Sequence, residues 1–390
     1  MKAFRRFSLI MVAVSLALTV ALWPRPGITN SGQASVQWLT SQSTPTAGDF
    51  LQATAPKPLE FPQDLGPHNG YQTEWWYYTG NLTTDSGREF GYQLTFFRRA
   101  LTPETAAVTN ASDWRSNQIY FSHFTISDIA NQDFYPHERF SRQSADLSGA
   151  QAAPYRVWLE NWSATEIEPG KVQLVAEADD VALNLTLHET LPPVLQGDRG
   201  YSQKGLEPGN ASYYYSIVQQ QSEGTITVAD ETFDVTGLTW KDHEFSTSAL
   251  SPGTVGWDWF SLQLNDGSAL MLYGLRRENG EITDVSSGTY ISATGETQSL
   301  PVTDWQIDVL DTWRSPNSKA AYPAQWHIEI PKLGLVLDGK SLMANQELNL
   351  SSTVYWEGAV GFEGAVAGQP VTAKGYVEMT GYADRLDAVL

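Results

Sequence analysis

The chain has 390 residues, of which 41% are hydrophobic, so it can bury a substantial core and is not intrinsically disordered. Its 44 acidic residues outnumber its 24 basic residues, and the formal charge of −20 excludes nucleic acid as an expected partner because the chain repels phosphates. The chain has no cysteine, which removes disulfides, thiol nucleophiles and cysteine-ligated metal sites.

Residues 1–27 have the pattern of a targeting segment. Lys2, Arg5 and Arg6 precede a short apolar run that ends at Trp23. This is typical of a secretory signal, but no A-x-A cleavage site follows, so a cleaved signal peptide and an uncleaved membrane anchor are both open. Either predicts an exported protein of the periplasm or cell envelope, secreted or held near the membrane.

Residues 28–58 are rich in Ser, Thr, Gln, Ala and Pro. This composition predicts a flexible linker between the targeting segment and the folded part. We therefore expect the folded region to begin near Leu59.

Two segments repeat one pattern, a strand, a turn with glycine and a second strand. In the first, Glu74–Leu82 is followed by Phe90–Arg99, and in the second, Gly256–Leu264 is followed by Leu270–Arg277. Each segment is therefore predicted to form a β-hairpin. The repeat itself indicates two similar all-β domains.

Side chains alternate between the two faces of a strand, so the repeat also predicts what each face carries. In the first hairpin Glu74 and Trp75 face opposite ways. In the second, Trp257 and Trp259 share one face and Asp258 points from the other. Tryptophans on a strand are more often core residues than part of a ligand site.

Further strand-like runs follow one another as far as Gly381, with little helical periodicity. Strands at this density favour sandwiches or closed barrels. We prefer two antiparallel β-barrel domains in tandem, 59–248 and 249–390, because barrels leave no exposed edge and can enclose a ligand. One long sandwich without a cavity is the alternative.

The densest group of titratable side chains lies in Trp240–Phe245. On a strand, Asp242 and Glu244 face one way and His243 faces the other. A histidine beside carboxylates can transfer protons near neutral pH, and nearby apolar rings shift such pKa values. These three residues and Asp258 are the candidate catalytic residues; a solvated strand end is the alternative.

The aromatic side chains around this group and in the first hairpin are the candidate lining of a site for a small hydrophobic ligand. They are Trp240, Phe245, Trp257, Trp259, Trp75 and Trp76, and Tyr273 and Glu74 are further candidate substrate-binding residues.

Glu74 stands beside two tryptophans, which is uncommon for a surface acid, and His68 lies in the turn before it. It is either a buried acid in a binding pocket or the partner of Arg98 or Arg99 across the hairpin. The ion pair is the favoured interpretation.

The sequence lacks H-E-x-x-H, G-x-S-x-G, a P-loop and G-x-G-x-x-G. No cofactor and no metal are therefore expected. The isolated histidines are expected to be structural; they are His123, His137, His188 and His327.

Taken in order, these motifs resemble the AttH/CrtC family. The motifs are His68, Tyr71-x-x-Glu74-Trp-Trp-Tyr-x-x-Gly-x-Leu82, Phe124, Phe134-Tyr135, Glu138-Arg139, Ser212-Tyr-Tyr-Tyr-Ser216, Trp240-x-Asp-His-Glu244 and Gly256-Trp-Asp-Trp-Phe260. That family includes carotenoid 1,2-hydratases and exported proteins described as secreted hydrolases or AttH-like transport components. The resemblance covers Leu59 to the C-terminus and implies two lipocalin-like β-barrel domains.

The resemblance to the hydratases implies a reaction that needs no cofactor. A protein acid protonates an isolated alkene, aromatic faces stabilise the carbocation, and a second group activates water. The family's histidine falls on His243, and its tryptophan two positions later falls on Phe245. The hydratases also need a tyrosine and an acid on the strand after Trp-Asp-Trp; Tyr273 is present here, but no carboxylate is.

Three functions therefore remain open. The leading hypothesis is an exported hydratase, a lyase acting on an apolar isoprenoid or lipid-like substrate, with His243 as acid and base and with Asp242 and Asp258 assisting. The alternative is a non-catalytic, lipocalin-like carrier of a hydrophobic ligand in the cell envelope, associated with an ABC transport system. A hydrolase is least favoured because no nucleophile–base pair can be named.

Overall fold

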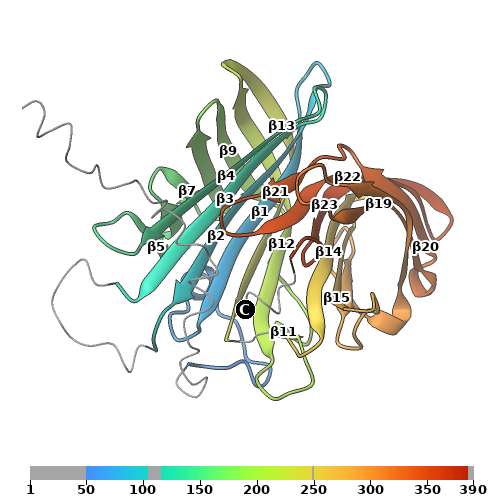
Figure 1. Cartoon of the computed structure of the whole chain (residues 1–390), viewed down its shortest axis with the longest axis horizontal. Helices are drawn as coiled ribbons and strands as arrows, with labels where there is room; N and C mark the ends of the chain where they lie inside the picture. The colour runs from blue at the N-terminus through green and yellow to red at the C-terminus, as the bar shows by residue number, and fades with distance from the viewer. Residues whose placement is uncertain (1–49, 104–115, 248–249, 385–390) are drawn as a thin grey trace, which may run out of the picture.

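The computed structural model describes residues 50–103, 116–247 and 250–384, and Figure 1 shows it as two curled sheets side by side. The predicted targeting segment 1–27 and most of the predicted linker lie outside these residues. Within them, the only helical elements are three short 3-10 turns, η2 (Gln63–Leu65), η4 (Val302–Asp304) and η5 (Pro331–Leu333). No helix in these ranges is long and apolar enough to cross a bilayer. The all-β class is confirmed.

The N-terminal domain is a 13-stranded antiparallel sheet. Its strands are β1 (Thr73–Thr83), β2 (Glu89–Ala100), β3 (Gln118–Asp128), β4 (Asp133–Arg142), β5 (Ser148–Ala152), β6 (Tyr155–Leu159), β7 (Trp162–Glu168), β8 (Lys171–Ala178), β9 (Val181–Glu189), β10 (Val194–Leu195), β11 (Tyr201–Gln203), β12 (Ala211–Val228) and β13 (Glu231–Ser246). The main order is β4-β3-β2-β1-β13-β12-β9-β8-β7-β6-β5, so β1 pairs with the last strand of its own domain and the sheet curls into a lipocalin-like barrel.

The C-terminal domain is a 10-stranded antiparallel sheet that also curls into a barrel-like shape. Its strands are β14 (Thr254–Leu264), β15 (Ala269–Arg277), β16 (Ser287–Ile291), β17 (Thr297–Pro301), β18 (Gln306–Arg314), β19 (Ala321–Ile330), β20 (Leu335–Ser341), β21 (Glu347–Asn349), β22 (Val354–Val366) and β23 (Gln369–Met379). The main order is β17-β16-β15-β14-β23-β22-β20-β19-β18. Here too the first strand, β14, pairs with the last, β23.

Both predicted hairpins are present. β1 pairs with β2 in continuous antiparallel register, and β14 pairs with β15. Gly87 and Gly267 occupy corresponding places in the two turns, and each has a φ of +86°, a left-handed conformation that glycine adopts without steric cost. A glycine at the same place in each turn therefore allows the chain to form a similar hairpin in both domains.

Strand alternation sorts the side chains as predicted. Trp76 and Tyr78 on β1 lie in the interior core of the N-terminal barrel, and Phe260 on β14 lies in that of the C-terminal barrel. The opposite faces carry Tyr77 and Trp259, which belong to a third core between the two domains. The outer faces of the two sheets thus pack against each other, with the Tyr77 ring of β1 against the Trp259 ring of β14.

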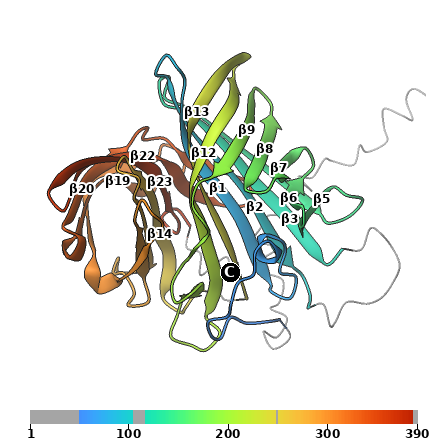
Figure 2. The same ribbon diagram turned by 180° about the vertical axis from the view of Figure 1, so that it is seen from behind.

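The described end of the predicted linker, residues 50–58, contacts the N-terminal domain. Ala53 is completely buried, and the Leu51 backbone N–H donates to the Gly70 carbonyl at 2.9 Å. The Lys57 amine lies over the Tyr213 ring, 4.4 Å from its centroid. Figure 2, from behind, shows this segment crossing one end of the N-terminal barrel.

Candidate functional site

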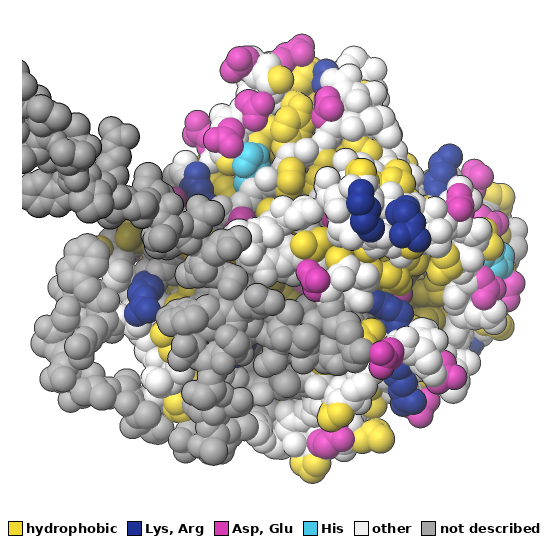
Figure 3. All heavy atoms as spheres, viewed as in Figure 1, with side chains coloured by type: hydrophobic (Ala, Val, Ile, Leu, Met, Phe, Trp, Pro, Cys, Tyr) yellow, Lys and Arg dark blue, Asp and Glu magenta, His cyan; other side chains and the backbone are white. Residues whose placement is uncertain are grey.

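The core between the two domains contains a group of buried and partly buried acids and aromatic side chains, which we call the interdomain cluster. Its acids are Asp242 and Glu244 from β13, Glu357 from β22 and Glu378 from β23; its aromatic members are Tyr77, Tyr214, Trp240, Trp257, Trp259, Tyr273 and Tyr355. Acidic surface side chains, by contrast, are scattered over the outer parts of both domains in the view of Figure 3. The cluster is therefore a feature of the interior.

Asp242 is held by three donors on the N-terminal side of the cluster. Its carboxyl accepts hydrogen bonds from the Tyr214 hydroxyl at 2.6 Å, from the Trp240 indole N–H at 2.7 Å and from the Ser216 hydroxyl. Burial nevertheless raises the pKa of Asp242 to about 7, because desolvation outweighs these three bonds. The group therefore changes protonation state near neutral pH.

Glu357 and Glu378 form a carboxyl pair on the C-terminal side. They are direct neighbours in the antiparallel register of β22 and β23. Burial, and for Glu357 also the charge of Glu378, raises the pKa of Glu357 well above its usual value and that of Glu378 to about 8. Two close carboxyls resist double ionisation, so the pair keeps a proton at neutral pH.

The carboxyl pair has aromatic partners from both domains. The Tyr77 hydroxyl donates to Glu357 Oε1, and the Trp257 indole N–H donates to Glu378 Oε1 at 3.2 Å. Glu357 is 1% exposed, and its Oε2 accepts no hydrogen bond from the described residues, although Tyr355 lies close to it. Glu357 thus has an unused oxygen in an aromatic environment.

Glu244 and Tyr273 have a different partner, Lys204. The Lys204 amine lies 2.9 Å from Glu244 Oε1 and 4.1 Å from the centre of the Tyr273 ring. The Trp259 indole N–H donates to the Tyr214 hydroxyl at 3.1 Å, which links the aromatic members of the two domains. Glu244 is therefore paired with a cation, unlike the other three acids.

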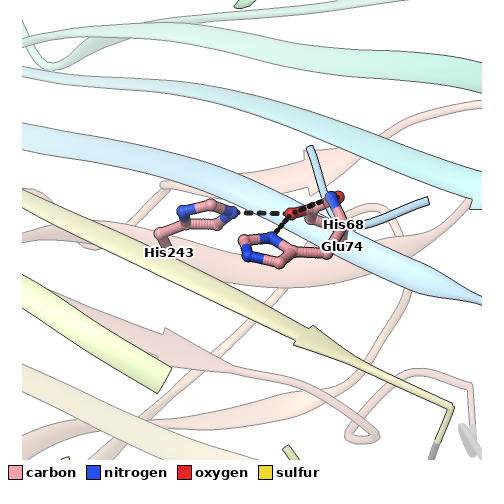
Figure 4. A group of neighbouring side chains, drawn as sticks. All are labelled: His68, Glu74 and His243. Carbon is pink, nitrogen blue, oxygen red and sulfur yellow. Dashed lines mark hydrogen bonds and ion pairs between the residues drawn. The ribbon is translucent and has the colours of Figure 1, made fainter. Parts of the chain in front are cut away.

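His243 points the other way, into the N-terminal barrel, where it meets Glu74 and His68. Figure 4 shows both imidazole rings directed at the Glu74 carboxylate. Glu74 Oε1 lies 2.8 Å from His243 Nε2 and 2.7 Å from His68 Nδ1. The second nitrogen of His243 is 2.8 Å from the Tyr215 hydroxyl. Both nitrogens of the buried imidazole therefore already have partners.

Charges around Glu74 are balanced within the protein. Arg98, completely buried, donates from Nε to Glu74 Oε2 at 2.8 Å, so the favoured ion pair is present. His68 Nε2 lies 2.7 Å from Asp64, and the two carboxylates raise the pKa of His68 against the effect of burial. Burial lowers the pKa of His243 to about 4, while Arg98 and the histidines hold that of Glu74 well below its usual range despite burial.

His68, Glu74 and His243 each offer a donor atom, and these atoms lie within 4.8 Å of one another. A metal ion is a poor fit here. The donor atoms are at hydrogen-bond distances from one another, and the Arg98 guanidinium already neutralises the carboxylate that a cation needs. We describe the group as a buried ion-pair network that fixes the end of the barrel.

Asp258 lies in a third place, on the inner side of the C-terminal domain. Its carboxyl accepts from Arg276 Nη1 and from the Tyr382 hydroxyl, both at 3.1 Å. Burial raises its pKa although the Arg276 charge opposes the rise. The expected grouping of His243 with Asp242 and Asp258 is not found, because alternation and domain packing send the three side chains to three separate environments.

The expected aromatic lining is also divided. Trp75 packs against the core between the domains, with the cluster members Trp240, Trp257, Trp259 and Tyr273. Trp76 and Phe245 instead stack on the histidines of the Glu74 network: Trp76 on His243 with centroids 4.9 Å apart, and Phe245 on His68 at 3.5 Å. Trp76 therefore belongs to the interior core of the N-terminal barrel, and Phe245 belongs to a separate apolar cluster with Tyr71 and Tyr213.

Sequence reasoning missed Glu357, Glu378 and Tyr355. Each of the two acids is the only charged residue of an apolar run, Val354-Tyr-Trp-Glu-Gly-Ala-Val and Gly375-Tyr-Val-Glu-Met. A single carboxyl in such a strand is a signal for a buried acid. Nothing local reveals that the two strands are neighbours.

The fold and the cluster define a two-domain, lipocalin-like β-barrel protein with a pair of neighbouring carboxyl groups between its domains. The family model for AttH-like proteins matches residues 52–382, and the chain belongs to this family. An AttH protein of known structure from Nitrosomonas europaea is 36% identical, with a TM-score of 0.75 over 84% of this chain and 99% of that chain.

Two more distant structures share the fold. Kievitone hydratase from Nectria haematococca is 17% identical with a TM-score of 0.66, and CghA is 12% identical with a TM-score of 0.53; each similarity covers 86% of this chain and 97% of the other. At these identities the likeness concerns the fold alone. No functionally curated protein matches the sequence.

Proposed function

We propose that the protein is a hydratase that adds water to a carbon–carbon double bond of an apolar, isoprenoid or lipid-like substrate at the interdomain cluster. The observation that carries the proposal is the pair of the buried Glu357 and the partly buried Glu378 among tyrosines and tryptophans. Protonating an alkene needs a neutral acid held away from water, and a carboxyl pair that keeps a proton at neutral pH meets that requirement.

Each step of the proposed reaction balances. Glu357 transfers its proton to one alkene carbon and becomes a carboxylate, and the other carbon becomes a carbocation. The faces of the neighbouring aromatic rings, Tyr77 and Trp259 among them, stabilise that positive charge. Water adds to the carbocation and releases one proton, and the Glu357 carboxylate takes up one proton, so no proton is gained or lost overall. The product is an alcohol, and the protein is unchanged.

His243 takes a different role in this proposal from the one expected from the sequence. With its pKa lowered to about 4, it is neutral at pH 7, and both its nitrogens are engaged with Glu74 and Tyr215. Asp242, at the neighbouring position of the same strand, faces the cluster instead. We therefore assign proton donation to the interdomain acids and the fixing of β13 to His243.

Incubation with acyclic carotenoids and shorter acyclic terpenes tests the proposal, with mass spectrometry to detect the gain of one water and labelled water to trace its oxygen. Glu357→Gln and Glu378→Gln should each lower the rate by about 10² to 10⁴, the usual contribution of general acid–base catalysis. Glu363→Gln, at an exposed position farther along β22, is the matched control and should keep the wild-type rate. Wild-type activity in Glu357→Gln contradicts the proposed acid.

A carrier function is the second candidate, and one observation favours it. The strand after Trp-Asp-Trp, β15, gives the cluster Tyr273 but no carboxyl group, unlike the hydratases that the sequence resembles. A carrier purified from its native envelope should show a bound hydrophobic molecule in native mass spectrometry. Apolar ligands should quench its tryptophan fluorescence without being converted.

We also propose export to the cell envelope, as the pattern in residues 1–27 predicts, and association with an ABC transport system remains part of the carrier hypothesis. Cell fractionation with N-terminal sequencing of the mature protein tests the first point. Recovery of the full-length chain from the cytosol would contradict it.

A further inference from the structure

The proposed acid, Glu357, is buried, so it must recover its proton after each reaction along some path. Water that attacks a carbocation does so from the side that is open to it, which need not be the side of the acid. The structure contains a row of polar side chains that leads away from Glu357 across the domain interface. Its members are Tyr355, His123 and Glu138, with Gln93, Ser351 and Ser352 around them.

Tyr355 is the member next to Glu357. The two residues are two positions apart on β22, so their side chains leave the same face of the strand. The Tyr355 hydroxyl accepts a hydrogen bond from Gln93 Nε2 at 3.1 Å. Because Gln93 donates to this oxygen, the hydroxyl's own proton is free to point either to Glu357 or to the group on its other side.

His123 is the group on that other side. Its Nδ1 lies 2.8 Å from the Tyr355 hydroxyl, and the imidazole is 2% exposed. The remaining nitrogen, Nε2, makes no hydrogen bond to any described residue. A buried imidazole with one nitrogen bonded to a tyrosine and the other unbonded can take up a proton at one end and release one at the other.

Glu138 lies beyond Nε2, at the outer end of the row. Its Oε1 is 3.5 Å from His123 Nε2, beyond hydrogen-bond length but within ion-pair range. The hydroxyls of Ser351 and Ser352, from the other domain, both donate to this carboxylate. Its side chain is 8% exposed, so the negative charge stands where a proton can arrive from solvent.

We propose that Glu138, His123 and Tyr355 form a proton relay that reprotonates Glu357. Glu138 attracts a proton to His123 Nε2; the Nδ1 proton passes to the Tyr355 oxygen as the Tyr355 proton passes to the Glu357 carboxylate. One proton enters at Nε2 and one reaches Glu357, so His123 and Tyr355 end with their starting charges. The imidazole then carries its proton on Nε2 and must return to the Nδ1–H tautomer before the next turnover. This inference rests on the proposed function of Glu357. It gives a proton-transfer role to His123, which the sequence indicated only as structural.

The exchange of the Glu357 proton with solvent tests the relay without a substrate. The C=O stretching band of a buried neutral carboxyl can be followed by infrared spectroscopy after transfer of the full chain into D₂O at neutral pH, and the Glu357→Gln variant identifies it. His123→Gln keeps a polar group near Tyr355, and Tyr355→Phe keeps the ring, but neither can pass a proton. Each should slow the deuterium shift of the band by about tenfold or more.

His188→Gln, at an exposed histidine of the same domain, is the control and should exchange at the wild-type rate. Thermal melts of all variants show whether the fold is kept. Exchange at the wild-type rate in either His123→Gln or Tyr355→Phe overturns the relay while leaving the proposed function standing. If no band is lost in Glu357→Gln, Glu357 holds no proton at neutral pH, and the proposed acid and its relay both fail.

Discussion

Replacing Asp242 by asparagine should change how the stability of the protein depends on pH. Asp242 is 4% exposed, and its pKa is raised from 3.8 to about 7 by burial. Between these two values the folded protein binds a proton that the unfolded chain has lost. Stability therefore falls as the pH rises through this range, which is the reverse of the usual behaviour of a paired carboxylate.

The magnitude follows from the two pKa values. A difference of about 3 pKa units corresponds to about 4 kcal/mol of unfolding free energy lost between pH 4 and pH 7.5. An asparagine side chain does not ionise, so the Asp242→Asn variant should lack this loss. The variant keeps a carbonyl oxygen for Ser216 and Trp240, and the Tyr214 hydroxyl can rotate to accept from the new amide.

Urea unfolding followed by tryptophan fluorescence, repeated at several pH values, measures the effect. The stability of Asp242→Asn minus that of the wild type should rise by about 3–4 kcal/mol from pH 4 to pH 7.5. Asp311→Asn, on the exposed strand β18, provides the matched control. A constant difference across this range refutes the reasoning, because it means that Asp242 ionises in the folded protein as easily as in the unfolded chain.

Glu74→Gln should lower the unfolding free energy by about 3–5 kcal/mol, because it leaves the buried Arg98 cation without its partner; near-wild-type urea denaturation would contradict this. The pKa of His243 is lowered from 6.5 to about 4 in the folded protein, so between these pH values the unfolded chain binds a proton that the folded protein does not. The unfolding free energy should therefore drop by up to about 3 kcal/mol between pH 6.5 and pH 4. His243→Gln should lose less stability over this pH range than the wild type. An equal loss in both proteins would contradict the prediction. Gly91→Ala should loosen the domain interface, because its new Cβ would come within 2.5 Å of the Tyr376 hydroxyl. Limited proteolysis should then cleave the variant faster between the domains than the wild type. An unchanged cleavage rate would contradict this prediction.

Much of the fold could be predicted because its signals are local. The alternation in Glu74–Leu82 and in its repeat Gly256–Leu264 sets which side chains share a face, and the structure keeps both hairpins. The ion pair of Glu74 was also within reach, since Arg98 lies directly opposite it across the hairpin. Strand periodicity and cross-strand pairing need only neighbours that are close in sequence or joined by a short turn.

The acid pair and the relay could not be predicted in this way. Glu357 and Glu378 meet because β22 and β23 are neighbours, and Glu378 comes under the influence of Asp242 only because the outer faces of the two sheets pack together. His123 and Tyr355 are 232 positions apart. Sequence alternation determined that His243 and Asp242 leave opposite faces of one strand. Which of those faces meets the other domain was decided by long-range packing, because burial and the pKa values that follow from it depend on everything that surrounds a side chain.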